Sequence, residues 1–149
     1  MSVAVRQAVP EDFDAIVPLF EAFYREEGFE DAVPGVAGNL RSILEREDTA
    51  AFVAERDGRA VGAAATSSAF GLEVGQYAEV EDIYVSPADR GQGIARQLIE
   101  AAFEWARSIG CHDIEIVITR HGREVAGLVP FYSGLGFKDA DRMIMERKL

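Results

Sequence analysis

A glycine-rich turn between a strand pattern and a helix pattern is the most informative feature for chemistry. The stretch Arg90-Gly91-Gln92-Gly93-Ile94-Ala95 follows a strand pattern that ends at Val85. Glycines there let the backbone approach a ligand closely, and the helix start presents N–H groups that lack intrahelical partners. Those donors, the helix dipole and Arg90 predict a site for an anion such as a diphosphate. The same pattern also occurs in turns that only connect a strand to a helix and bind no ligand, and both interpretations stay open here.

Two familiar phosphate-binding motifs do not fit this turn. A dinucleotide-binding fingerprint needs a third glycine, but that position is Arg96. A nucleoside-triphosphate P-loop needs Gly-Lys-Ser/Thr after the second glycine, and the sequence lacks it. The remaining interpretation is the pyrophosphate of coenzyme A.

The elements that must position this turn form a mixed α/β pattern. Asp57-Gly58 between two apolar runs predicts a hairpin, and the apolar run 114–118 suits a strand covered on both faces. Predicted strands cover residues 3–6, 51–55, 60–64, 78–85, 114–118 and 143–145. Predicted helices cover 10–28, 38–46 and 93–108, with a short helical turn at Phe131-Tyr132.

Length and composition place the chain in a broad class. Its 149 residues fit one domain, 1–149. No stretch has the roughly 18 apolar residues of a membrane span, and no secretion signal opens the sequence, so we expect a cytoplasmic protein. Cys111 is the one cysteine, and with two histidines it predicts neither an internal disulfide nor a metal site. Cys111 follows the predicted helix end at Gly110 and is expected to lie far from the glycine-rich turn in the fold, so we do not expect it to act as a nucleophile.

The formal net charge of −11 argues against nucleic acid as a partner. Nucleic-acid binders carry a basic face, because phosphate contacts supply most of their non-specific affinity. An acidic protein can concentrate a cationic substrate near its surface. The same charge can also serve solubility alone.

The glycine-rich turn resembles a known family motif. Residues Arg90 to Ala95 are similar to the Gln/Arg-x-x-Gly-x-Gly/Ala motif of the GNAT superfamily of acetyl-CoA-dependent N-acetyltransferases. The strand ending Val85-Ser86-Pro87 and the segment Phe131 to Phe137 resemble the same family, and the order of elements agrees over nearly the whole chain. The resemblance implies an α/β fold: a mixed, mostly antiparallel sheet with two central splayed parallel strands, flanked by about four helices.

The resemblance also implies how acetyl-CoA binds. The pantetheine would pair with the backbone of Ile83 and Val85, in the gap between the splayed strands, and the pyrophosphate would lie on backbone amides near Arg90. Arg96 is either a further phosphate contact or a helix-surface arginine. The full set of expected coenzyme contacts is Ile83, Val85, Arg90, Gly91, Gln92, Gly93, Ile94, Ala95, Arg96 and Phe131.

Three groups are expected to serve the transfer of acetyl to an amine. In related enzymes a glutamate in a Glu-Asp-x-x-Val strand is the proposed base, and Glu81 is the matching residue. Glu79 is the second candidate. Either glutamate could instead be a strand acid that pairs with an arginine. Tyr132 matches the family tyrosine that protonates the departing thiolate, or it only packs beside Phe131. The backbone N–H of Val85 is the expected donor to the acetyl oxygen.

The acceptor is expected to enter past the loop between the first two helices. Aromatic and acidic residues there and on the strand, namely Tyr24, Glu27 and Glu79, suggest a primary amine of a small cationic molecule. Val125, Leu128 and Pro130 depart from the family pattern, and Pro130 disfavours helical geometry at Val129. These departures keep open a non-catalytic acyl-CoA sensor, and an enzyme that acts on a protein N-terminus or lysine is a second alternative. Homodimerisation is common in the family, and the sequence does not decide it.

Overall fold

The computed structural model describes residues 2–149, which form two compact units. The first unit runs to Val117 and the second covers Ile118–Leu149. None of the helices in the described residues is long and apolar enough to cross a bilayer. We describe each unit separately.

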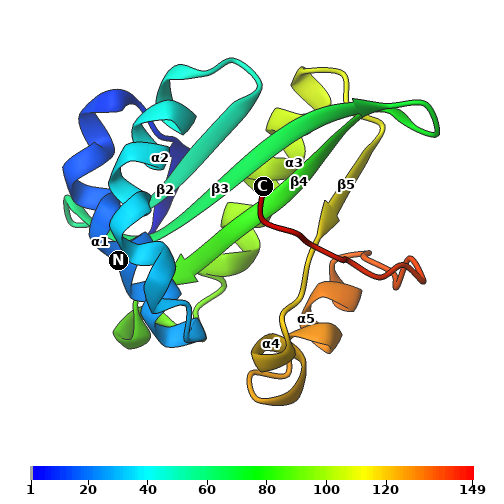
Figure 1. Cartoon of the computed structure of the whole chain (residues 1–149). Coiled ribbons are helices and arrows are strands. Elements are labelled where there is room, and N and C mark those ends of the chain that lie inside the picture. Colours follow the sequence, from blue (N-terminus) through cyan, green and yellow to red (C-terminus); the bar gives the residue numbers. More distant parts are fainter. Residues whose placement is uncertain (1) are drawn as a thin grey trace. The chain divides into compact units, whose positions relative to one another are not determined.

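The first unit is built on one five-stranded sheet (Figure 1). Its strands, in both chain and spatial order, are β1 (Ala4–Gln7), β2 (Thr49–Arg56), β3 (Arg59–Gly71), β4 (Gly75–Val85) and β5 (Asp113–Ile116). Neighbouring strands are antiparallel except β4 and β5, which are parallel. The predicted mixed, mostly antiparallel sheet is confirmed.

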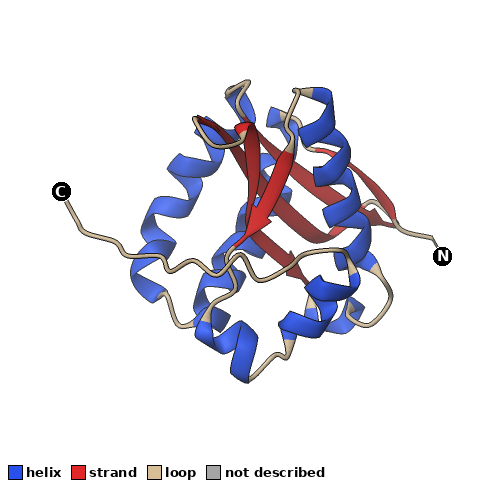
Figure 2. Cartoon of the chain, turned by 90° about the vertical axis from the view of Figure 1, so that its right-hand side faces the viewer, coloured by secondary structure: helices blue, strands red, loops and turns tan. Residues whose placement is uncertain are grey.

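Helices cover both faces of this sheet, as Figure 2 shows. α1 (Phe13–Glu27) and α2 (Val33–Glu45) bury Ile16, Phe20 and Leu40 against one face. α3 (Ile94–Ser108) buries its apolar stripe, including Leu98 and Trp105, against the other. Single 3-10 turns stand at Pro10–Asp12, Glu30–Ala32 and Pro87–Asp89.

α2 begins five residues before the predicted start at Gly38. Pro34 is its second residue, where a missing N–H costs nothing, and Val36 is buried against the core. Gly35 and Gly38 weaken the helical pattern in the sequence, so packing and not propensity sets this start.

The second unit contains two short helices, α4 (Arg120–Glu124) and α5 (Leu128–Gly134). The expectation that Pro130 would displace Val129 from helical geometry is wrong, because both lie in α5. Pro130 is the third residue of that helix, and N–H groups of the first turn have no intrahelical acceptor to lose.

The predicted strand 143–145 is also wrong. These residues form no strand in the described chain, and Met143 and Met145 are 84% and 88% exposed. A run of three apolar residues satisfies the strand pattern, but a strand also needs a partner ladder for its backbone groups. As a result β5 is the last strand of the sheet.

Candidate active site

A β-bulge in β4 places the adjacent acids Glu81 and Asp82 on one side of the sheet, together with Glu79. Ala65 of β3 pairs with Asp82 and Thr66 pairs with Val80, so Glu81 is an extra residue without its own partner. The bulge breaks the alternation of a regular strand, and adjacent residues Glu81 and Asp82 both bond toward the α1–α2 side. The hydroxyl of Ser67 donates to the Glu81 carboxylate at 2.5 Å. The hydroxyl of Tyr24, on α1, donates to the Asp82 carboxylate at 2.7 Å.

Asp82 and Tyr24 share a small pocket of about 90 Å³ between α1, α2 and the sheet. Asp82 is the acidic member of its lining, which is otherwise mainly apolar: Phe20, Tyr24, Ala32, Val36, Asn39, Leu40, Ile43, Ala65 and Asp82. A water molecule in the liquid occupies about 30 Å³, so the pocket has room for a few heavy atoms. A carboxylate within an apolar wall is suited to hold a positively charged group of modest size.

Burial and neighbouring negative charges raise the pKa values of two acids on this face, Glu79 and Asp82, toward neutral pH. Burial raises the pKa of Glu79 to about 7, and the charges of Glu81, Glu115 and Asp82 add to the rise. Burial likewise raises the pKa of Asp82 to about 6, against the opposing effect of the Tyr24 hydrogen bond. Burial and the charge of Asp82 raise the pKa of Tyr24 above its ordinary value. Groups with pKa values near neutral pH can exchange protons with a substrate.

These shifts predict that the protein is less stable at pH 8 than at pH 5. In the unfolded chain Glu79 and Asp82 ionise near pH 4, whereas in the folded chain they hold their protons to about pH 7 and 6. Between these limits the folded state binds more protons, so the free energy of unfolding falls as pH rises. Urea unfolding of Glu79→Gln should show a smaller fall between pH 5 and pH 8 than the wild type. An equal fall would show that Glu79 is not the group responsible.

The end of β4 has an open backbone edge. β5 pairs with β4 only as far as Val80 opposite Ile116, so residues 81–85 have no parallel partner. The Ser86 N–H donates to the Val61 carbonyl, and antiparallel ladders alternate, so Tyr84 and Asp82 bond toward β3. Ile83 and Val85 therefore direct their N–H and C=O groups to the open edge. This is the splay expected between the parallel strands, and it fits the amide-rich pantetheine arm.

The glycine-rich turn has the geometry of an anion cradle. Gly91 and Gly93 have φ of 76° and 79°, the left-handed region that side chains rarely adopt. Gly93 is the N-cap of α3 and offers no side-chain cap, so the first N–H groups of the helix face outward uncapped. Nothing lies within 4 Å of the position where a Cβ would stand on either glycine. These residues fit a bound pyrophosphate.

Arg90 in the turn and Arg96 on α3 have different surroundings. The Arg90 Nε donates to the Val85 carbonyl at 2.9 Å, and its guanidinium pairs with Glu26 of α1 at 2.8 Å. Arg90 thus connects the turn to the end of β4 and to α1. Arg96 lies exposed on α3 and pairs with Glu100 at 3.1 Å, as a helix-surface arginine does.

Gly93→Ala is expected to weaken acetyl-CoA binding about tenfold. A residue with a side chain is less stable in the left-handed region by about 1–2 kcal/mol. The turn of the variant therefore favours other conformations, and acetyl-CoA binding must restore the left-handed one at that cost in affinity. Gly110→Ala is the matched control: Gly110 follows the end of α3, with φ of 86° and open space around it. Calorimetry should show weaker binding for Gly93→Ala alone, although both variants lose stability. Equal affinities for the two variants would contradict a coenzyme site at this turn.

The remaining expected site residues fall in other places. Tyr132 and Phe131 lie in α5 of the second unit, where the buried Tyr132 ring packs edge-to-face on Phe131 at 5.1 Å and Phe137 at 5.8 Å. Glu27 is the last residue of α1. The structure brings Tyr24, Glu79 and Glu81 to one face of the first unit, together with Asp82, which sequence reasoning did not select.

Comparisons with known proteins identify the family. A model described as the acetyltransferase (GNAT) family matches residues 13–137. The chain belongs to this family. Membership confirms the expected class, an N-acetyltransferase with acetyl-CoA as its donor.

Individual relatives agree with this assignment to the GNAT family. An uncharacterised N-acetyltransferase of Methanocaldococcus jannaschii is 28% identical over 92% of this chain, and this chain spans 61% of that protein. An aminoglycoside N(6')-acetyltransferase of Salmonella typhimurium is 32% identical over 71% of this chain and 74% of its own length. A solved aminoglycoside N-acetyltransferase in complex with coenzyme A superposes with a TM-score of 0.82 at 25% identity, over 99% of this chain and 95% of that one.

Proposed function

We propose that this GNAT family member acetylates the primary amine of a small cationic molecule, with acetyl-CoA as the donor. The observation that carries the proposal is the acidic face of the first unit, where Asp82, which lines the pocket, directly precedes the open edge of β4 at Ile83 and Val85. The acidic residues lie beside the part of the strand that fits pantetheine. A cationic acceptor is therefore attracted to the place where acetyl would be presented.

The composition of this face favours a cation over a neutral amine. The charge of Glu81 raises the pKa of both Glu79 and Asp82, and a positive ligand would relieve this repulsion. The relative that acetylates aminoglycosides, which are polycationic amines, supports a small-molecule acceptor. The pocket volume suits one ammonium-bearing arm, with the rest of the acceptor outside it.

The residues on this face can perform the acceptor's proton transfer. Bound acetyl-CoA supplies an acetyl thioester that reacts with a neutral amine. An alkylammonium has a pKa near 10.4, so a carboxylate must take its proton at neutral pH. Glu79 is half-buried with a pKa of about 7, which suits a base, whereas Glu81 is exposed and bonded to Ser67. We therefore place Glu79 ahead of Glu81 in this role.

The pH dependence of kcat/KM distinguishes the two glutamates. If Glu79 is the base, kcat/KM should rise up to about pH 7 as its carboxyl ionises, and level off above it, because the carboxylate takes its proton from the ammonium form of the amine. Glu79→Gln should lower the rate and remove the change of slope, and Glu81→Gln should keep it. The reverse pattern would assign the base to Glu81. An unchanged profile in both variants would mean that neither carboxylate acts as base.

The function itself is tested by a panel of amines. Free coenzyme A thiol is measured as acetyl-CoA is consumed in the presence of polyamines, aminoglycosides, amino acids or peptides, while calorimetry follows acetyl-CoA binding. We expect thiol release with one class of small cationic amine. Release with peptides alone would favour a protein acceptor. Tight acetyl-CoA binding without release across the panel would favour the sensor.

A further inference from the structure

An ion cluster around the buried Asp89 links the β2–β3 hairpin to the coenzyme turn. Asp89 ends the 3-10 turn just before Arg90, and it is only 3% exposed. Arg56, the last residue of β2, donates through one guanidinium nitrogen to Asp89 at 2.6 Å. Its other terminal nitrogen donates to the side-chain oxygen of Gln92, also at 2.6 Å. Arg59, across the hairpin, stands 3.7 Å from Asp89.

This arrangement holds the first part of the turn, from Asp89 to Gln92. Asp89 and Gln92 flank Arg90 and Gly91, and one planar guanidinium holds their side chains at a set spacing. The backbone N–H of Asp89 also donates to the Ser86 carbonyl at 2.8 Å. Because Gly91 and Gly93 allow many backbone conformations, something outside the turn must restrict it. The guanidinium of Arg56 is suitably placed to do so.

We propose that Arg56 is a positioning residue for coenzyme binding, which holds the turn 90–95 in its binding conformation through Asp89 and Gln92. Arg56 acts through these two side chains and not by contact with the acceptor. Without Arg56 the turn becomes ordered only when acetyl-CoA binds, and the loss of conformational entropy lowers the affinity for acetyl-CoA. The value of kcat at saturating acetyl-CoA should not change. The inference rests on the proposed coenzyme site at the turn.

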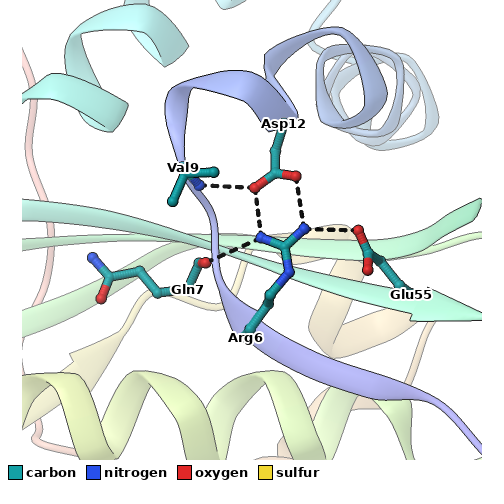
Figure 3. A network of polar contacts seen from close by, with 5 residues as sticks. All are labelled: Arg6, Gln7, Val9, Asp12 and Glu55. Carbon is teal, nitrogen blue, oxygen red and sulfur yellow. Dashed lines mark hydrogen bonds and ion pairs between the residues drawn. The ribbon is translucent and has the colours of Figure 1, made fainter. Parts of the chain in front are cut away.

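The test compares Arg56→Gln with a matched arginine in another network. Arg6 of β1 likewise joins two side chains with one guanidinium, donating to Asp12 at 2.7 and 2.8 Å and to Glu55 at 2.8 Å (Figure 3). Arg6→Gln removes an equally large network at the edge strand, away from the turn in sequence. Calorimetry with acetyl-CoA should show a dissociation constant about tenfold higher for Arg56→Gln and unchanged for Arg6→Gln. The value of kcat at saturating acetyl-CoA and the KM for the amine should stay within about twofold of wild type.

A double-mutant cycle separates positioning from general stability. Gln92→Ala and Arg56→Lys should each weaken acetyl-CoA binding by about threefold, since lysine cannot hold both partners in the same geometry. The double variant should be little worse than either single one, because both changes break the same link. This cycle decides the question if Arg56→Gln does not fold. Fully additive effects, or no effect of Arg56→Lys, would overturn the inference.

Gly93→Ala tells failure of this inference from failure of the coenzyme site. Weaker binding in Gly93→Ala with wild-type binding in the Arg56 variants would keep the site and overturn the role of Arg56. Wild-type binding in all of these variants would remove the coenzyme from this turn, and the inference with it.

Discussion

Asp82→Asn is expected to lower kcat/KM for a cationic amine about 100-fold without changing the affinity for acetyl-CoA. Asp82 is the acidic residue in the pocket lining, and its carboxylate already accepts the Tyr24 hydroxyl. Truncating one member of a desolvated charge pair typically costs about 2–5 kcal/mol of binding free energy. A 100-fold loss corresponds to about 2.8 kcal/mol, which lies within this range. Asparagine keeps the shape of the side chain and a hydrogen-bond acceptor for Tyr24, so the change isolates the charge.

Two comparisons make this experiment specific to the pocket. Asp48→Asn breaks an exposed pair with Arg46 and should leave kinetics unchanged, which controls for the loss of one negative charge. A linear diamine and a monoamine of equal length should both be tested with Asp82→Asn. A loss confined to the diamine would place its second ammonium group at Asp82, and an equal loss would place the reacting amine there. Wild-type kinetics with both acceptors would show that Asp82 does not recognise the substrate.

Sequence patterns predicted the elements that carry their own local signals. The Asp57-Gly58 hairpin and the apolar stripe of α3 were correct, because turn geometry and helical period are properties of neighbouring residues. The glycines of the turn were identified by the same local logic, since left-handed positions and helix starts have distinctive residues. The family motif there added the coenzyme to a fold already indicated by period and turns.

Features that depend on pairing between distant segments were not predicted. The bulge at Glu81 follows from the register of β3 against β4, and no residue near Glu81 signals it. Regular alternation would place Asp82 on the face opposite Glu81, so the sequence pattern does not indicate that both carboxylates lie on one face. The strand at 143–145 failed for the converse reason: its residues suit a strand, but no partner in the described chain pairs with them. Likewise, Arg56 bonds to Asp89 and Gln92, which lie 33 and 36 positions further along the chain.

The sequence therefore shows which acids are present, but it does not show on which face of the sheet each one lies or how deeply it is buried. The strand contains Glu79, Glu81 and Asp82, and composition alone shows three carboxylates near one strand end. Burial separates them: Glu79 and Asp82 acquire pKa values of about 7 and 6, whereas Glu81 lies exposed beside Ser67. The roles proposed above, Asp82 for binding and Glu79 for the proton, rest on this difference in burial.

Tyr132→Phe is expected to reduce kcat about 100-fold while the affinity for acetyl-CoA stays within twofold of wild type. A phenol has a pKa near 10 and can protonate the departing thiolate, and a positioned acid contributes about 10²–10⁴-fold. Phenylalanine keeps the ring contacts with Phe131 and Phe137, so binding and packing should persist. Phe137→Leu is the converse control, because it removes one of these ring contacts and retains the hydroxyl. A large loss in Phe137→Leu with full turnover in Tyr132→Phe would mean that Tyr132 serves packing, and that the thiolate takes its proton from another donor.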